Sequence, residues 1–189
     1  MAKDNQSRGS RGKRPSQLTV TLPQLLVDGS DLEFREFVAD FYAAVAGAQS
    51  LQRALAKSVG LSSAEFSILL ATWDLQKRAA VGVTAVAKHL HVAAAHVTAE
   101  VGKLVRAGYI KKTQHPKDTR AVILALTKKG EKTLNDLTPL LRDINDRLFA
   151  IDAPDSEIIA KFLKHVAHEI GNSVRTVRNY RDRPLGSSR

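Results

Sequence analysis

Two short segments with β character surround a polar, turn-forming tip between Gly108 and Thr127, in the stretch GYIKKTQHPKDTRAVILALT. Their apolar and β-branched residues predict strands near 109–113 and 121–126. The tip between them is basic, and it carries a single arginine, Arg120, beside Asp118. Any fold of this chain therefore has to hold a basic hairpin at its surface.

Helical periodicity precedes the hairpin. Apolar residues recur at spacings of three and four after Asp31, which suits a helix N-cap, and the pattern stops at Gly60. Ser62 or Ser63 then caps a second helix with Phe66 on its apolar side. Two further helices follow, a short one in the segment AVAKHL and another in AAAHVTAEVGKLVRAG.

Two long helices follow the hairpin. Thr127 caps the first of them, and Pro139 inside it predicts a kink or a local break. A turn at 152–154 precedes the last helix, which runs towards Val177. The predicted fold is mainly α-helical with one small β-hairpin.

Positive charge and missing cysteines limit the classes of protein to consider. The formal net charge is +10, and the basic residues gather in both tails and in the block 61–127. Such clusters suit a polyanion partner, although solubility alone explains them equally well. The chain has no cysteine, which excludes disulfides and thiolate metal sites. With no apolar leader or long apolar run, we expect a soluble, cytoplasmic protein.

Two helices joined by a tight turn and followed by a basic hairpin form the arrangement of a winged helix-turn-helix. The second helix would bury Val97, Val101 and Leu104. Its outer face would then carry small residues that allow a helix to lie deep in a DNA groove, namely Ala94, Ala95, Thr98, Ala99 and Gly102. A surface helix of a small α+β domain is the alternative.

Four motifs resemble the DNA-binding core of the MarR family of transcription regulators. They are LSSAEFSILLATW, VAKHL, LVRAGYI and KDTRAVILALTKKG, in which the wing and the Leu-Thr-x-x-Gly sequence that follows it are the most specific. The likeness extends over roughly residues 31–170. It implies a winged helix-turn-helix domain at 61–127, embedded in a helical dimerisation domain at 31–60 and 128–181. Outside it lie a disordered basic tail at 1–15, an extended arm at 16–30 and a flexible tail at 182–189.

The resemblance also implies roles for individual residues. Arg120 would enter the minor groove while Asp118 orients it, and Lys111, Lys112 and Lys117 would contact phosphates. A local ion pair that shapes the turn is the alternative for Asp118 and Arg120. The predicted DNA-binding residues are Thr84, Ala94, Ala95, His96, Thr98, Ala99, Lys103, Lys111, Lys112, Lys117, Asp118, Thr119 and Arg120.

The recognition helix departs from the family pattern at three positions. The family commonly has Ser, Thr or Arg near Ala95 and Ala99, so direct base readout rests here on Thr98, His96 and Lys103. Glu100 stands where the family has an apolar residue. Either it pairs with a nearby histidine or lysine, or the helix is rotated from the expected register.

The resemblance implies a small aromatic or acidic effector, which members of the family generally bind between the dimerisation helices and the winged domain, and we expect no cofactor. An effector pocket would be lined by Phe37, Phe41, Tyr42, Arg53, Phe66 and Trp73, although aromatic residues at helical spacing are more often core. Two groups of residues contain the His and Glu side chains that zinc can bind, but we do not expect zinc sensing in the absence of cysteine. These groups are His89, His91, His96 and Glu100, and His165, His168 and Glu169.

The sequence carries no enzyme motif of the GxxxxGK, GxSxG, HExxH or CxxC type. The resemblance to the MarR family implies a ligand-responsive repressor that binds a pseudo-palindromic operator in double-stranded DNA as a homodimer. Two alternatives stay open. One is a constitutive DNA-architectural protein that binds through its basic tails, and the other is a small-molecule binding protein with a vestigial winged domain.

Overall fold

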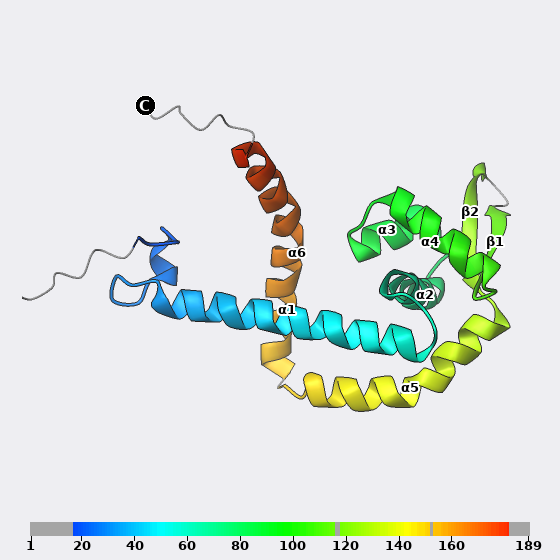
Figure 1. Ribbon diagram of the computed structural model, residues 1–189, viewed down its shortest axis with the longest axis horizontal. Coiled ribbons are helices and arrows are strands. Elements are labelled where there is room, and N and C mark those ends of the chain that lie inside the picture. Colours follow the sequence, from blue (N-terminus) through cyan, green and yellow to red (C-terminus); the bar gives the residue numbers. More distant parts are fainter. Residues whose placement is uncertain (1–16, 116–117, 152, 182–189) are drawn as a thin grey trace, which may run out of the picture. The chain divides into compact units, whose positions relative to one another are not determined.

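The computed structural model describes residues 17–115, 118–151 and 153–181 of the chain (Figure 1). The chain divides into two compact units, residues 1–55 and 56–189, and the boundary between them lies within the first long helix. The elements are a 3₁₀ turn at Pro23–Leu25, α1 (Leu32–Ser58), α2 (Ser63–Gln76), α3 (Val83–Leu90), α4 (Ala94–Arg106), β1 (Ile110–His115), β2 (Asp118–Leu126), α5 (Lys128–Leu148) and α6 (Ala153–Arg181). This order confirms the mainly helical fold with one hairpin.

The core of the second unit forms around α2. Phe66, Ile68 and Leu69 of α2 are at most 1% exposed, and α3, α4, α5 and β2 all contact this helix. Its buried residues face several directions because neighbours surround it, so it lacks the single apolar stripe of a surface helix. The remaining buried side chains of this unit come from the end of α1 (Ala56), from α2 itself, and from α3, α4, α5, both strands and Val81 before α3.

The N-terminus of α2 is fixed by Ser62. Its hydroxyl accepts a hydrogen bond from the backbone nitrogen of Glu65 at 3.2 Å, and the Glu65 carboxylate accepts one from the nitrogen of Ser62 at 2.9 Å. This reciprocal capping box settles the choice between Ser62 and Ser63. The bond from the Ser62 nitrogen is the main reason why the pKa of Glu65 lies below its ordinary value.

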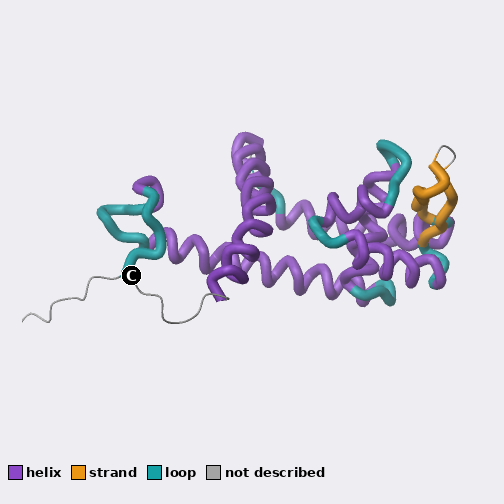
Figure 2. The backbone as a smooth tube through the Cα atoms, turned by 90° about the horizontal axis from the view of Figure 1, so that it is seen from above, coloured by secondary structure: helices purple, strands orange, loops and turns teal. Residues whose placement is uncertain are grey.

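The hairpin is antiparallel and pairs Ile110 with Leu126 through to Gln114 with Val122 (Figure 2, strands in orange). Both strands extend further towards the tip than the sequence predicted. Val81 forms an isolated bridge to Leu124, whose nitrogen donates to the Val81 carbonyl at 2.7 Å. The base of the hairpin is therefore attached to the segment that precedes α3.

Pro139 lies inside α5, which is one continuous α-helix, so the local break left open by the sequence does not occur. The axis of α5 changes direction part-way along its length in Figure 1, as expected when a proline removes one backbone hydrogen bond. Among the described residues no single helix is long and apolar enough to span a membrane, and α1 and α2 pass that test only together, as a bent pair.

The arm before α1 is less extended than the sequence predicted. It contains the 3₁₀ turn at Pro23–Leu25 and a tight turn closed by hydrogen bonds between Val27 and Ser30. Asp28 and Gly29 both have positive φ in this turn, which favours an aspartate followed by a glycine.

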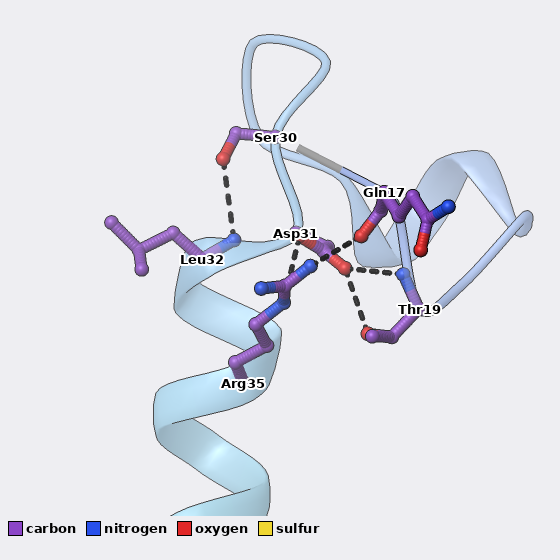
Figure 3. A network of polar contacts seen from close by, with 6 residues as sticks. All are labelled: Gln17, Thr19, Ser30, Asp31, Leu32 and Arg35. Carbon is purple, nitrogen blue, oxygen red and sulfur yellow. Dashed lines mark hydrogen bonds and ion pairs between the residues drawn. The ribbon is translucent and has the colours of Figure 1, made fainter. Parts of the chain in front are cut away.

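Asp31 fastens this arm to the first turn of α1 (Figure 3). Its carboxylate accepts hydrogen bonds from the nitrogen of Thr19 at 2.6 Å and from the Thr19 hydroxyl at 2.7 Å, and it pairs with Arg35 at 3.1 Å. Arg35 also donates to the carbonyl of Gln17 at 2.6 Å. Asp31 is only 3% exposed, and these donors, the Thr19 nitrogen above all, lower its pKa to about 2.

The Asp31 contacts predict acid sensitivity of the arm. Because the pKa of Asp31 is lowered from 3.8 to about 2, the unfolded arm binds more protons than the folded arm between these values. The stability that Asp31 contributes is fully present above pH 5 and is lost as the pH falls towards 2. The protection factors of the amides in residues 17–31, which correct for the intrinsic pH dependence of hydrogen exchange, should fall over this range, and Asp31→Asn should flatten the dependence. An equally steep profile in Asp31→Asn would contradict the assignment.

Candidate nucleic-acid interface

The turn between α3 and α4 is short and tightly bonded. His91 caps α3 in the left-handed conformation, with φ of 54°, and its nitrogen donates to the carbonyls of Ala87 and Lys88. The nitrogen of Val92 donates to the same Ala87 carbonyl at 3.0 Å. α3 begins at Val83 with Gly82 as its N-cap, so Thr84 is the second residue of the helix, with an exposed side chain.

The two faces of α4 differ sharply. Val97, Val101 and Leu104 are completely buried, as the sequence predicted, and they attach the helix to α2 and α3. The opposite face is exposed and consists mainly of small residues: Ala94, Ala95, His96, Thr98 and Ala99. Thr98 donates its hydroxyl to the Ala94 carbonyl at 3.0 Å, so its oxygen remains available as an acceptor.

Glu100 is held at the buried edge of α4 by Lys103. The Lys103 ammonium donates to one carboxylate oxygen at 2.8 Å, and Glu100 is 8% exposed. This bond is the main cause of the raised pKa of Lys103. Of the alternatives that the sequence left open, pairing with a nearby lysine is therefore the one observed. The second oxygen of Glu100 is buried and has no hydrogen-bond partner among the described residues.

The wing presents lysines along β1. Lys111 and Lys112 have exposed side chains on this strand, next to α4 in the fold. Lys117 lies outside the described residues, and so do the side chains of Asp118, Thr119 and Arg120, whose backbone begins β2. The geometry of the predicted wing-tip arginine is therefore not part of the described structure.

Thr127 joins the wing to the helix that follows it. Its nitrogen donates to the Tyr109 carbonyl at 3.0 Å, and its hydroxyl donates to the Gly108 carbonyl at 2.6 Å. The same hydroxyl accepts from the nitrogen of Gly130 at 3.2 Å and so caps α5. Gly130 packs so closely on Tyr109 that a Cβ atom there would collide with the Tyr109 carbonyl oxygen. These contacts give the physical reason for the Leu-Thr-x-x-Gly sequence.

The Gly130 packing predicts a large effect of adding one methyl group. Gly130→Ala should lower the free energy of unfolding by roughly 1–3 kcal/mol, since the clash is with backbone and α5 must shift to relieve it. Gly47→Ala is the matched control, because a Cβ atom at that helical position meets nothing within 4 Å. Urea denaturation of both variants tests this, and equal stability of Gly130→Ala and the wild type would contradict the packing.

The residues predicted to line an effector pocket differ in their exposure and in their contacts. Phe37 and Tyr42 are exposed on α1, Phe41 has its ring 5.7 Å from that of Tyr42, and Arg53 donates to Ser50 at 2.7 Å. Phe66 is 1% exposed and belongs to the core, the alternative role that the sequence left open for aromatic residues.

Trp73 is half-buried and lies beneath the Lys77 ammonium, 4.0 Å from the ring centroid. The second unit also contains an open cleft of about 350 Å³, and none of the predicted pocket residues lines it. Its lining is Ser58, Val59, Tyr109, Thr133, Asp136 and Leu137.

In the part of the chain that the structure describes, no three His, Asp or Glu side chains are placed together to hold a metal ion. The histidines there therefore form no metal site. His168 lies 3.7 Å from the carboxylate of the adjacent Glu169. Glu100, one of the considered ligands, is instead bonded to Lys103.

Known structures share this arrangement. The chain aligns with a MarR transcriptional regulator from Methanosarcina mazei over 74% of its length and 99% of that protein's, at 20% identity and a TM-score of 0.53. It aligns with the transcriptional regulator BldR from Sulfolobus solfataricus over 72% and 94%, at 25% identity and a TM-score of 0.55. The chain has the winged helix-turn-helix fold of MarR transcriptional regulators.

Sequence comparisons also match transcriptional regulators. Residues 50–137 match the family of transcriptional regulator SarA/Rot. A 52-residue segment is 42% identical to the HTH-type transcriptional regulator BilQ of Clostridioides difficile, covering 28% of this chain. The chain spans about a third of the length of the curated relatives that it matches. The matched proteins are transcriptional regulators and not enzymes, in agreement with the sequence prediction.

Two further similar structures contain DNA or p-coumaroyl-CoA. The Staphylococcus aureus MepR–DNA complex aligns over 69% of this chain and 94% of MepR, with 16% identity and a TM-score of 0.57. CouR from Rhodococcus jostii bound to p-coumaroyl-CoA aligns over 68% and 91%, with 19% identity and a TM-score of 0.58.

One residue near the recognition surface was missed by the sequence analysis. Arg106 ends α4 with an exposed side chain, on the same face as Ala95 and Ala99. The spacing of three and four residues from Ala95 through Ala99 and Gly102 to Arg106 is the signal that identifies it.

Proposed function

We propose that this protein is a cytoplasmic, sequence-specific DNA-binding transcriptional regulator that acts on a pseudo-palindromic operator as a homodimer and responds to a small molecule. The observation that carries the proposal is the two-sided character of α4. One side is completely buried against α2 and α3, and the other presents an exposed row of small residues.

A helix with this surface fits the major groove. Alanine side chains allow the helix axis to approach the bases closely, and the Thr98 hydroxyl and the His96 ring supply polar contacts. The pairing of Lys103 with Glu100 places its ammonium near the flank of the helix, where phosphates lie. Thr84 in the first turn of α3 is also exposed, and we assign its hydroxyl to a phosphate contact as well.

The wing adds contacts in the neighbouring groove. Lys111 and Lys112 are exposed on β1 and provide charge for the backbone phosphates. By resemblance to the family, Arg120 enters the minor groove with Asp118 and Thr119 beside it, and Lys117 contacts a phosphate. MepR, which shares this fold, has been observed in complex with DNA, and this supports DNA binding here.

Unpartnered apolar residues support a homodimer. α6 carries a stripe at spacings of three and four residues, in which Ile159, Leu163, Ile170 and Val174 are 41–52% exposed. An exposed apolar stripe of this length is unfavourable in water unless a second surface covers it. A second copy of the chain also gives two recognition helices for the two halves of an operator.

The stripe on α6 predicts the effect of polar substitutions on assembly. Leu163→Gln and Ile170→Gln together should raise the dimer dissociation constant by at least about tenfold, since each loses roughly 1.5–3 kcal/mol of apolar burial. Lys164→Gln is the matched control on the exposed side of the same helix. Analytical ultracentrifugation measures the constant, and a wild-type chain that is monomeric at micromolar concentration would refute the dimer.

A small aromatic or acidic effector is the proposed signal, by analogy with CouR, which has been observed with p-coumaroyl-CoA. The open cleft beside Tyr109 is a candidate location, because Tyr109 is bonded to Thr127 and so to the joint between the wing and α5. A ligand there would favour one arrangement of that joint over another and thereby change DNA affinity.

Competition between DNA sequences tests the proposal. Duplexes enriched by the wild-type protein from a random library should bind about 10³-fold or more tightly than random DNA at physiological salt. A DNA-architectural protein would show no such preference. If Arg120→Ala bound the enriched duplex as well as the wild type at moderate salt, the wing assignment would be wrong and a ligand-binding protein with a vestigial wing would be favoured.

A further inference from the structure

One face of α4 consists of three very small residues followed by an arginine. Ala95, Ala99, Gly102 and Arg106 recur at spacings of four, three and four, which places them in one row along the helix. Ala95, Ala99 and Arg106 are exposed. The row therefore forms a shallow surface that a DNA base edge can approach, with one guanidinium at its end.

Arg106 extends back along this row. A Cβ atom at Gly102 would lie 3.7 Å from Nη1 of Arg106, so the guanidinium lies beside Gly102, one turn towards the N-terminus from its own Cα atom. Glycine leaves this position open for it. In the described part of the chain, Arg106 donates no hydrogen bond and forms no ion pair, so all of its donors remain available.

Lys103 provides the contrast on the same helix. Its ammonium is bonded to Glu100 at 2.8 Å, at the buried edge of α4 and away from the row. Glu100 raises the pKa of Lys103 through this bond, while the nearby Arg106 guanidinium lowers it. Of the two basic residues in the last turn of α4, Arg106 is thus the one directed along the small-residue row.

We infer that Arg106 reads a guanine in the major groove, as a specificity-determining residue for the proposed operator. The planar guanidinium matches the O6 and N7 acceptors of guanine with two donors in a rigid fork, whereas a lysine ammonium is a point charge on a flexible stem. The inference rests on the proposed function. It explains how a recognition helix made largely of alanine discriminates between base pairs.

The test compares the sequences selected by the wild type and by three variants from a random duplex library. The variants are Arg106→Ala, Arg106→Lys and, as the matched control, Lys103→Ala. Arg106 is exposed and has no hydrogen-bond or ion-pair partner among the described residues, so its variants should melt like the wild type in circular dichroism.

We expect Arg106→Ala to lose, by about tenfold or more, the preference for guanine at one position of each half-site. Arg106→Lys should keep affinity for random DNA and should retain a weaker preference for guanine than the wild type, because lysine contacts the same acceptors without the rigid fork. Lys103→Ala should weaken all duplexes alike and leave the selected sequence unchanged. Equal loss on all duplexes in Arg106→Ala, restored by Arg106→Lys, would reduce Arg106 to a phosphate contact and overturn the inference.

Two other results separate this inference from the function on which it rests. An unchanged selected sequence in Arg106→Ala, with a clear selection by the wild type, would overturn the role of Arg106 alone. A wild-type protein that enriches no sequence would overturn sequence-specific binding itself.

Discussion

The burial of Val97, Val101 and Leu104 against the central helix α2 determines the orientation of everything on the outer face of α4. These three side chains are inaccessible to water, and each contributes roughly 1.5–3 kcal/mol of apolar burial. A helix fixed in this way has no freedom to rotate about its axis. Its opposite face is therefore presented to a partner in one fixed orientation, which preorganises it for recognition.

The joint between wing and α5 is the second constraint. Thr127 satisfies the carbonyls of Gly108 and Tyr109 and caps α5 at the same time, while Gly130 allows the helix to approach the Tyr109 backbone. The end of α4, the start of β1 and the first turn of α5 thus meet at one bonded junction. A change in the direction of α5 would be transmitted to the recognition surface through these contacts.

Much of this architecture follows from sequence patterns. The apolar spacing in 94–106, the strand pattern of the hairpin and the cap at Thr127 are local signals, and the structure agrees with them. The role of Phe66 could not be predicted from the sequence, because an apolar residue on α2 has the same spacing whether it lines a pocket or fills a core. The Asp31 network was also hidden, since Thr19 lies twelve residues away and no periodicity links the two. Arg106 escaped notice because a basic residue at a helix end is expected on electrostatic grounds alone.

The central claim is that the small-residue face of α4 lies in the major groove with the β1–β2 wing beside it. A crystal structure of the protein with a duplex that it selects from random DNA tests this most directly. The account predicts that Ala95, Thr98 and Ala99 face base edges, while Val97 and Leu104 stay packed on the α2 side. A complex in which α4 is remote from the groove, with DNA held elsewhere on the chain, would contradict it.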